Sequence, residues 1–463
     1  MPIGGVDMWP KVAAFLLLGY LAMGREFAYW GVPALQAFVG ELVLAAFIVR
    51  HPAAVFGRWL GALLRGTVLA EVAWGFYLFL AYGIFEVLRG LRIGYPVLTV
   101  LQNFAFNYYP LYLFLGLWVG ARDPEFLRRL IRPLAWWNGV YGAAWIIVLR
   151  EWQFVVPGGF VRFFGQPGGA AVALLGLLVF EPRWRRVWPL LLLNTFVLLG
   201  TEVRAEWLGF LVGLCAWGAV TLQVGRLLNV FGSAVALLWV AYLVDFRMPG
   251  GRGGELSTRG VIGRALAPIN EDLAEQYIVS AEASAGTVSW RTDWWAEIWA
   301  SVHADRLTAL IGHGYGFSLA SLASFVGDQT TRTPHNIFYY ALGYSGWAGV
   351  GIFFAFQFAL VRLLWKAYRI TGQPFGLIFW AAAMTQAFFG NVLETPFGAI
   401  PFYLVVGISV APAVEREHRQ HAVASIGHRA RSRQPNVGRL VVLPGRGAPI
   451  PRSTRRHARI NPG

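Results

Sequence analysis

Residues 334–356 of the chain read PHNIFYYALGYSGWAGVGIFFAF. A proline, a histidine and an asparagine here end a long polar interval, Phe246–Thr333, and an apolar run long enough to cross a membrane follows directly. No other long polar stretch separates hydrophobic segments of this sequence. A histidine at the mouth of a membrane helix, next to an interval with its own charges and tryptophans, indicates chemistry at a membrane surface.

Composition assigns the chain to the integral membrane proteins. Apolar residues make up 57% of the 463 residues, only 14% are charged, and the mean hydropathy is +0.52, which excludes an ordinary soluble domain. Apolar windows that could cross the hydrocarbon as helices recur at about 9–24, 31–49, 67–88, 95–119, 131–149, 167–181, 187–201, 205–222, 227–245, 335–360, 374–390 and 396–413. We therefore predict an all-α, polytopic membrane helix bundle with about 12 transmembrane helices. The range is about 10–12, because the sixth and seventh windows are short and poorly separated.

Basic residues in the short connections predict the orientation, because cytoplasmic loops of membrane proteins carry an excess of Arg and Lys. With the N-terminus inside, the cytoplasmic connections hold Arg50, Arg58, Arg65, Arg122, Arg128, Arg129, Arg132, Arg183, Arg185, Arg186, Arg226, Arg362, Lys366 and Arg369. The opposite connections hold only Arg25, Arg89, Arg92, Arg150, Arg162 and Arg204. We expect both termini in the cytoplasm and the polar interval on the outer side.

Three parts follow from this pattern: a transmembrane bundle over 1–413, a large and partly helical outer loop over 246–333 between the ninth and tenth spans, and a basic tail over 414–463. The tail is rich in Arg and poor in large apolar residues, so we expect it to be disordered. Its charge fits contact with anionic membrane lipids. The favoured alternative is a solvated segment that fixes the topology, and nucleic-acid binding is not needed to explain the charge.

Metal and nucleotide motifs are not found in the sequence. Cys215 is the only cysteine and lies within a hydrophobic window, and no Cys/His cluster has metal-ligand spacing. No Asp-x-Asp pair occurs, although many sugar-nucleotide transferases use one to hold a divalent ion. Gly312-x-Gly314-x-Gly316 lacks the lysine and the strand–turn–helix context of a phosphate loop, so a flexible turn is the favoured interpretation.

Three elements carry the chemical signal. The first is TEVRAEW at 201–207, where Arg204 opens a span; an arginine there indicates a water-filled cavity or an anionic partner. Alternatively, Arg204 reaches the interface or pairs with Glu202 or Glu206. The second is WRTDWWAEIW at 290–299, in which helical spacing places Arg291, Trp295 and Trp299 on one face. Such a helix suits an interfacial anchor and a ligand clamp equally well.

The third element is His335-Asn336, where a helix begins after Pro334. A neutral imidazole can accept a proton near physiological pH, although a single histidine at a helix boundary is more often structural than catalytic. By the topology argument, all three elements lie on the same side of the membrane.

The ordered set resembles the O-antigen ligase and polymerase family of bacterial integral-membrane glycosyltransferases. The matching segments are VRAEWLGF, WRTDWWAEIW, LIGHGYGF, TPHNIFYYALGYSGWAGV and NVLETPFGAIPFYLVVG, over roughly 190–410. One departure is Glu202-Val203 before Arg204, where members often carry a serine beside the arginine.

The resemblance implies an inverting glycosyltransferase of the bacterial inner membrane, with a periplasmic active site and an undecaprenyl-diphosphate-linked glycan as donor. The acceptor would be a hydroxyl of lipid A-core or of a growing glycan. His335, Arg204 and Arg291 would be catalytic, and Arg204, Arg291 and Asn336 would bind the diphosphate or substrate. Two arginines suit a diphosphate leaving group, so we expect neither metal nor cofactor.

Two alternatives stay open. A protein O-glycosyltransferase of the same family shares the donor chemistry and differs only in the acceptor. A flippase or transporter of lipid-linked glycans belongs to another class and is typically built from repeated halves with interrupted helices. We see no corresponding halves in this sequence, although Glu41, Glu71 and Glu86 lie within or near early spans.

Overall fold

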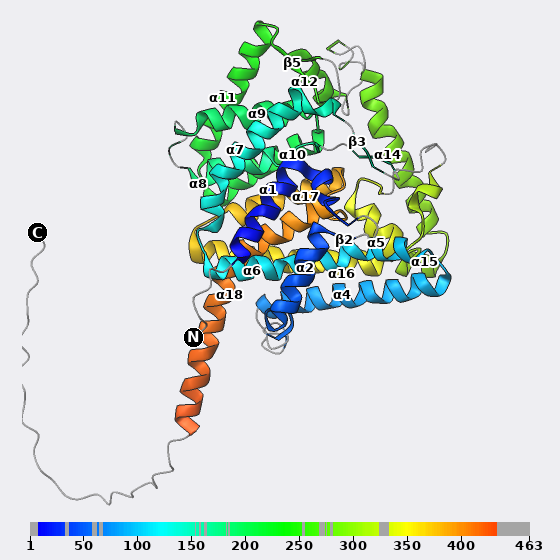
Figure 1. The fold of residues 1–463 in the computed structure, drawn as a ribbon, viewed down its shortest axis with the longest axis vertical. Helices are drawn as coiled ribbons and strands as arrows, with labels where there is room; N and C mark the ends of the chain where they lie inside the picture. Colours follow the sequence, from blue (N-terminus) through cyan, green and yellow to red (C-terminus); the bar gives the residue numbers. More distant parts are fainter. Residues whose placement is uncertain are drawn as a thin grey trace, which may run out of the picture. The chain divides into compact units, whose positions relative to one another are not determined.

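The structure is a computed structural model, shown in Figure 1. It describes residues 8–32, 37–57, 63, 68–152, 154–156, 159–161, 164–181, 183, 186–251, 255–267, 274, 276–277, 281–323 and 333–432. The chain divides into two units, residues 1–415 and residues 416–463. Arg58, Arg65, Arg162 and Arg185, which contributed to the predicted orientation, lie outside the described residues.

The described residues are overwhelmingly helical, in agreement with the predicted all-α class. Each apolar window of the sequence contains at least one helix. These helices are α1 (Trp9–Ala28), α2 (Val39–Arg50), α4 (Val68–Ile93), α5 (Val97–Tyr108), α6 (Tyr112–Arg122), α7 (Phe126–Ile147), α8 (Ala170–Phe180), α9 (Trp188–Gly200), α10 (Arg204–Thr221), α11 (Val224–Leu243), α16 (Ile337–Thr371), α17 (Phe375–Phe389) and α18 (Pro396–Ser432).

Four helices within the described residues are long and apolar enough to cross a membrane: α4, α11, α16 and the first part of α18, Pro396–Gln420. This supports a membrane protein. Three shorter apolar helices, α8, α9 and α17, accompany them. A helix of 12 residues is only about 18 Å long, so α2 and α5 do not by themselves span about 30 Å of hydrocarbon. The prediction of about 12 crossings therefore stays a prediction.

The short helices have local causes. Pro110 lies in the 3₁₀ turn η3 (Tyr109–Leu111), which divides the fourth apolar window into α5 and α6. Proline lacks the N–H that a continuous helix would need there. The second window begins with the hairpin strands β1 (Gly31–Val32) and β2 (Ala37–Phe38), so α2 starts only at Val39.

Strands are limited to three antiparallel pairs in the described residues. Besides β1–β2, these are β3 (Phe154–Val156) with β4 (Gly159–Val161) and β5 (Arg247–Pro249) with β6 (Glu255–Ser257). The pair β5–β6 opens the polar interval and aligns Met248 with Leu256, both buried. None of these pairs contributes a sheet to the core.

Small residues permit close helix packing inside the bundle. A Cβ atom at Gly116 of α6 would lie 2.3 Å from the carbonyl oxygen of Leu404, and one at Gly407 of α18 would lie 2.3 Å from that of Leu113. The two helices therefore touch backbone to backbone, as is common where apolar solvent provides no hydrophobic drive for association. Aromatic rings fill the neighbouring space, with Phe79 of α4 stacked near Phe356 of α16.

The predicted outer loop is partly helical where it is described. It contains α12 (Thr258–Leu266), α14 (Ala281–Val302), α15 (Arg306–Ile311) and the 3₁₀ turn η6 (Leu319–Leu322). The fully buried indole of Trp294 in α14 donates a hydrogen bond to the carbonyl of Leu319, at 2.9 Å. The polar interval 246–333 is thus stabilised in part by contacts between its own residues.

The basic tail differs in part from its prediction. Helix α18 continues to Ser432, beyond the expected boundary at residue 413. Ala, Glu, Arg and Gln, which dominate 413–421, are good helix formers, so the helix propagates past the apolar segment. Residues 433–463 lie outside the described residues.

A break in α16 holds the polar interval in place. Gly346 lies inside this helix with φ +60° and ψ −167°. The carbonyls of Gly343 and Tyr344 accept hydrogen bonds from the backbone N–H groups of His313 and Gly314, each at 2.9 Å. The Gly312-x-Gly314-x-Gly316 segment therefore packs backbone against backbone on the break, with a positive φ at all three glycines.

Arg89 of α4 binds the same segment from the other side. Its guanidinium donates to the carbonyls of Ile311, at 2.5 Å, and of Gly312, and it pairs with the buried carboxylate of Glu86 at 3.0 Å. The interval is thereby fixed to both α4 and α16, which lie side by side in Figure 1.

A substitution at the break tests this packing. A Cβ atom at Gly346 would lie 2.5 Å from the backbone of residues 310–312, and an L-residue in this backbone region, which is essentially restricted to glycine, carries a further penalty of about 1–3 kcal/mol. We expect Gly346→Ala to lower the apparent Tm of the purified protein by several degrees. Gly351→Ala is the matched control, because nothing lies within 4 Å of its Cβ position in the same helix. Equal melting of the two variants would contradict the proposed packing.

Candidate functional site

Helix α14 places Arg291 beside the start of α16. The indole of Trp295 donates a hydrogen bond to the carbonyl of Pro334, at 2.7 Å, and its ring stacks on Tyr339 with an interplanar angle of 10°. One turn later Trp299 contacts Trp347 of α16 at a ring distance of 6.0 Å. The predicted Arg–Trp–Trp face therefore packs against the helix that follows His335.

Asn336 begins α16. Its side-chain oxygen accepts from the backbone N–H groups of Phe338, at 2.9 Å, and Tyr339, at 3.4 Å, which caps the helix. Such a cap stabilises a helix by about 1 kcal/mol. A part in substrate binding, predicted for Asn336, would depend on the amide nitrogen, because the oxygen is already engaged.

His335 has an unusual backbone conformation. Its φ is +53°, in the left-handed region that is uncommon for residues other than glycine, although Asn, Asp and His adopt it more often than the rest. The cap of Asn336 on one side and the hydrogen bond from Trp295 to Pro334 on the other hold it there. Strained residues of this kind concentrate at functional sites, so the geometry favours a function for the imidazole.

The imidazole of His335 lies among polar and aromatic groups. The ring of Trp290 meets it edge to face at 6.0 Å, and the Arg291 guanidinium carbon lies 5.3 Å from the centre of the Trp290 ring. Burial and the charge of Arg291 lower the pKa of His335 from 6.5 to about 4, and a hydrogen bond with Asn391 opposes the shift only in part. The free imidazole is therefore neutral at physiological pH, with a lone pair available to accept a proton.

The segment Phe389–Asn391 joins the predicted elements. Arg291 donates to the carbonyl of Phe389 at 3.4 Å, and the side chain of Asn391 lies near enough to the imidazole of His335 to affect its pKa. A Cβ atom at Gly390 would lie 3.9 Å from that of Ala205, the residue that follows Arg204. The structure thus makes Arg291 and His335 neighbours and connects the start of α10, with Arg204, to both through this segment.

Glu202, considered from the sequence as a partner of Arg204, contacts the polar interval. Its buried carboxylate forms an ion pair with Arg264 of α12, in the polar interval. The φ of Glu202 is +59°, so the chain turns sharply just before α10 begins. This turn directs the first residues of α10 toward the cavity described next.

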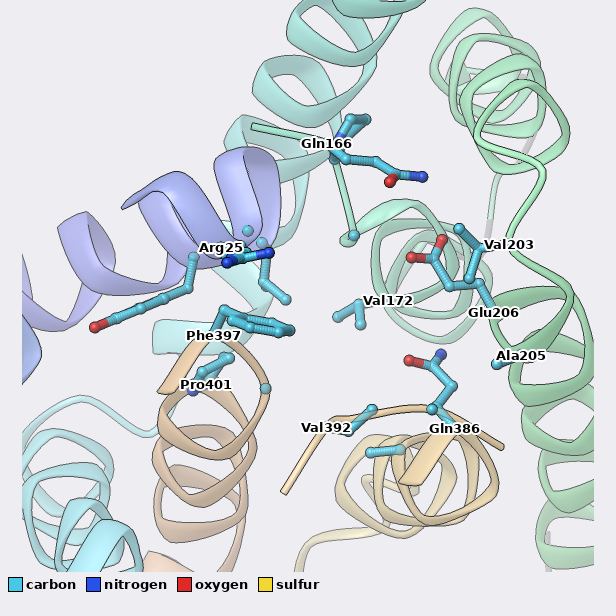
Figure 2. Close-up of a pocket in the computed structure, with 18 of the residues that line it drawn as sticks. Arg25, Gln166, Val172, Val203, Ala205, Glu206, Gln386, Val392, Phe397 and Pro401 are labelled. Carbon is cyan, nitrogen blue, oxygen red and sulfur yellow. The ribbon is translucent and has the colours of Figure 1, made fainter. Parts of the chain in front are cut away.

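A cavity of about 470 Å³ lies beside the segment Phe389–Asn391. Its walls come from the end of α1, the segment before α8, the start of α10, the end of α17 and the start of α18. The carboxyl of Glu206 points into it, with Gln386 of α17 and Arg25 of α1 on other walls (Figure 2). Val203 and Ala205 also line it, on either side of Arg204 in the sequence.

Several of these residues were not assigned from the sequence. Asn391 belongs to NVLETPFG, which was noted only as a resemblance to a loop, and Gln386 lies within an apolar window. A polar residue at the end of an otherwise apolar span is the signal that could have identified both. Glu206 was considered only as a partner of Arg204.

Comparisons with known proteins leave the family undecided. No protein-family model matches the chain, and no curated protein matches it. Within the described residues, no group of three or more His, Cys, Asp or Glu side chains is placed to hold a metal ion. The resemblance to O-antigen ligases and polymerases therefore stays a prediction based on the motifs.

The pKa of His335 predicts how stability depends on pH. Between pH about 4 and 6.5 the unfolded chain binds a proton at this imidazole that the folded chain does not, so stability rises with pH across this window. We expect the apparent Tm to fall on acidification from pH about 7 to about 4.5, and to fall less in His335→Gln. Identical pH profiles for the two proteins would show that the folded imidazole titrates normally.

Proposed function

We propose that this chain is a membrane glycosyltransferase that moves a glycan from undecaprenyl diphosphate to an acceptor hydroxyl. The observation that carries the proposal is the convergence of Arg291, His335 and the start of α10 on Phe389–Asn391, at the edge of a cavity. A neutral imidazole beside a guanidinium supplies a proton acceptor and an anion-binding group within one site.

The reaction follows from these two groups. The acceptor oxygen attacks the anomeric carbon, its proton passes to the imidazole of His335, and the bond between that carbon and the diphosphate oxygen breaks. The leaving diphosphate takes the electron pair, and Arg291 and Arg204 stabilise the added negative charge through hydrogen bonds. Attack opposite the leaving group inverts the anomeric centre.

Binding of the donor would also change the pKa of His335. In the free protein the positive charge of Arg291 contributes to the low pKa of His335. A bound diphosphate would offset that charge and raise the pKa of His335 toward the working pH, where a general base is most effective. The imidazole would then be a stronger base in the complex than in the free protein.

The proposal places the protein in a bacterial inner membrane, with both termini in the cytoplasm and the site facing the periplasm. It is supported by the distribution of basic residues and by the lipid-linked donor, which has to be reached from the bilayer. Among the acceptors, we favour lipid A-core or a growing glycan over a protein hydroxyl. In a deletion strain, loss of all long chains from lipid A-core would indicate a ligase, and a single capped repeat unit would indicate a polymerase.

Substitutions at the three predicted residues test the transferase. We expect His335→Ala and His335→Gln to lower turnover roughly 10²–10⁴-fold, because the acceptor loses its base. Arg204→Lys and Arg291→Lys keep the charge but lose the planar fork of donors, so transfer should also fall strongly. The readout is surface polysaccharide in a deletion strain that carries each variant at matched expression.

Arg416→Ala, in the basic tail, is the control and should leave the polysaccharide normal. Normal polysaccharide from the His335 and Arg291 variants would refute the catalytic assignment. Failure of those variants to insert into the membrane would instead favour a structural role for the two residues.

Removal of divalent cations with EDTA tests whether the arginines alone stabilise the leaving diphosphate. If the arginines stabilise the diphosphate without help from a cation, transfer by the purified protein should continue in EDTA. Loss of transfer in EDTA, followed by recovery on addition of magnesium or manganese, would show that a metal ion shares this role.

A further inference from the structure

The cavity beside Phe389–Asn391 has two kinds of wall. Hydrogen-bonding side chains reach it from several elements: Arg25, Glu26, Gln166, Glu206, Gln386 and Asn391. Aromatic rings supply much of the rest, namely those of Trp145, Phe379, Phe397 and Phe402. Its volume of about 470 Å³ falls within the range of small-molecule sites, about 300–1,000 Å³.

Glu206 carries one of the two polar atoms of this cavity that the described residues leave without a hydrogen-bond partner; the other is the hydroxyl of Tyr20. The Glu206 side chain is buried, and its Oε2 atom has no hydrogen-bond partner among the residues that the structure describes. Its other oxygen faces Gly168, where an added Cβ atom would lie only 3.5 Å away. An unpartnered carboxyl costs folding free energy, so a ligand that brings hydrogen-bond donors would remove the penalty.

The side chains that line the cavity indicate which class of ligand it can bind. A polyprenyl chain offers no donor to the unsatisfied oxygen of Glu206, and an ionised diphosphate offers only acceptors. A sugar offers hydroxyl groups that donate to the carboxyl of Glu206 and exchange hydrogen bonds with Gln166, Gln386 and Asn391. Its apolar C–H faces would pack on the aromatic rings.

We propose that this cavity is the sugar subsite of the transferase and that Glu206 is its specificity-determining residue. The inference rests on the proposed function and deepens it. Asn391 lines the cavity and lies near the imidazole of His335, and the preceding Phe389 carbonyl accepts from Arg291, so a sugar bound here lies next to the proton acceptor. The sugar is either the one transferred from the donor or the one that carries the acceptor hydroxyl.

Steady-state kinetics of the full-length protein distinguish the transferred sugar from the acceptor sugar. The donor is lipid-linked glycan extracted from the deletion strain, and the acceptor is lipid A-core or the same extracted glycan. We expect Glu206→Leu to raise one KM roughly 10–100-fold, because the hydrogen bonds between the buried carboxyl and the sugar are lost, and Glu206→Gln to raise it less. A rise in the acceptor KM alone assigns the acceptor sugar, and a rise in the donor KM alone assigns the transferred sugar.

Glu125→Gln is the matched control, because this carboxylate is exposed at the start of α7 and lies outside the cavity. The Gln variant at position 206 keeps the shape of the side chain, and the carboxyl oxygen that it replaces has no partner, so insertion and folding should be preserved. Unchanged KM values in both Glu206 variants, at normal expression, would overturn the assignment.

Thiol labelling tests binding without any turnover. The chain has one cysteine, so Cys215→Ser yields a cysteine-free background in a single step. In that background we expect extracted lipid-linked glycan or lipid A-core to protect Gln386→Cys from a thiol reagent, and undecaprenyl diphosphate without glycan to protect it much less. Equal protection by all three, or protection by none, would contradict a sugar subsite.

The outcomes separate this inference from the proposed function. If His335→Ala abolishes transfer while the Glu206 variants behave normally and no protection occurs, only the sugar subsite is wrong. If His335→Ala and the Arg291 variant transfer normally, the proposed function is wrong, whatever the labelling shows.

Discussion

The contact on which the candidate site depends is the one between the break in α16 and the glycine-rich segment of the polar interval. Because Gly346 interrupts the helix, the carbonyls of Gly343 and Tyr344 are available to the N–H groups of His313 and Gly314. Arg89 holds the preceding carbonyls from α4. This fixes one end of the interval to the membrane helices, and the contacts of Trp294 and Trp295 then orient α14, so that Arg291 lies beside His335. The glycine motif is thus structural, and a phosphate-binding role is not needed to explain it.

Electrostatics at the site follow from this arrangement. Partial burial and the nearby guanidinium both disfavour the imidazolium, so the free site combines a cation with a neutral base. Under the proposed function, a bound anion would make the imidazole more basic, so anion binding and proton acceptance would support each other. The positive φ of His335 costs folding free energy, and the surrounding hydrogen bonds maintain it. Rigid placement of the imidazole is the result.

The sequence predicted the positions of the helices well, because long apolar runs have few other stable conformations in a membrane. It indicated the number of membrane crossings less well. Pro110 and the β1–β2 hairpin shorten the helices, although the apolar windows that contain them are long enough to span a membrane. At the site, Arg291 and His335 were identified from motifs, and the structure makes them neighbours. Asn391 and Gln386 were missed because their roles arise from the meeting of α10, α14 and α17, and such tertiary contacts leave no local pattern. The substrate-binding role of Asn336 stays a prediction, and the structure adds that its side-chain oxygen caps α16.

Two buried carboxyls near this site have oxygen atoms without a hydrogen-bond partner among the described residues, which costs folding free energy. Neither oxygen of Glu394 makes a well-formed hydrogen bond with the described residues, and burial raises the pKa of this carboxyl to about 8, with nearby backbone N–H groups opposing the shift. Glu394 lies three residues after Asn391, and Glu206 lies two residues after Arg204, so both belong to the segments that meet at Phe389–Asn391. An apolar residue would stabilise either position. Of the two, Glu206 lines the cavity, where a ligand could supply the missing hydrogen bond.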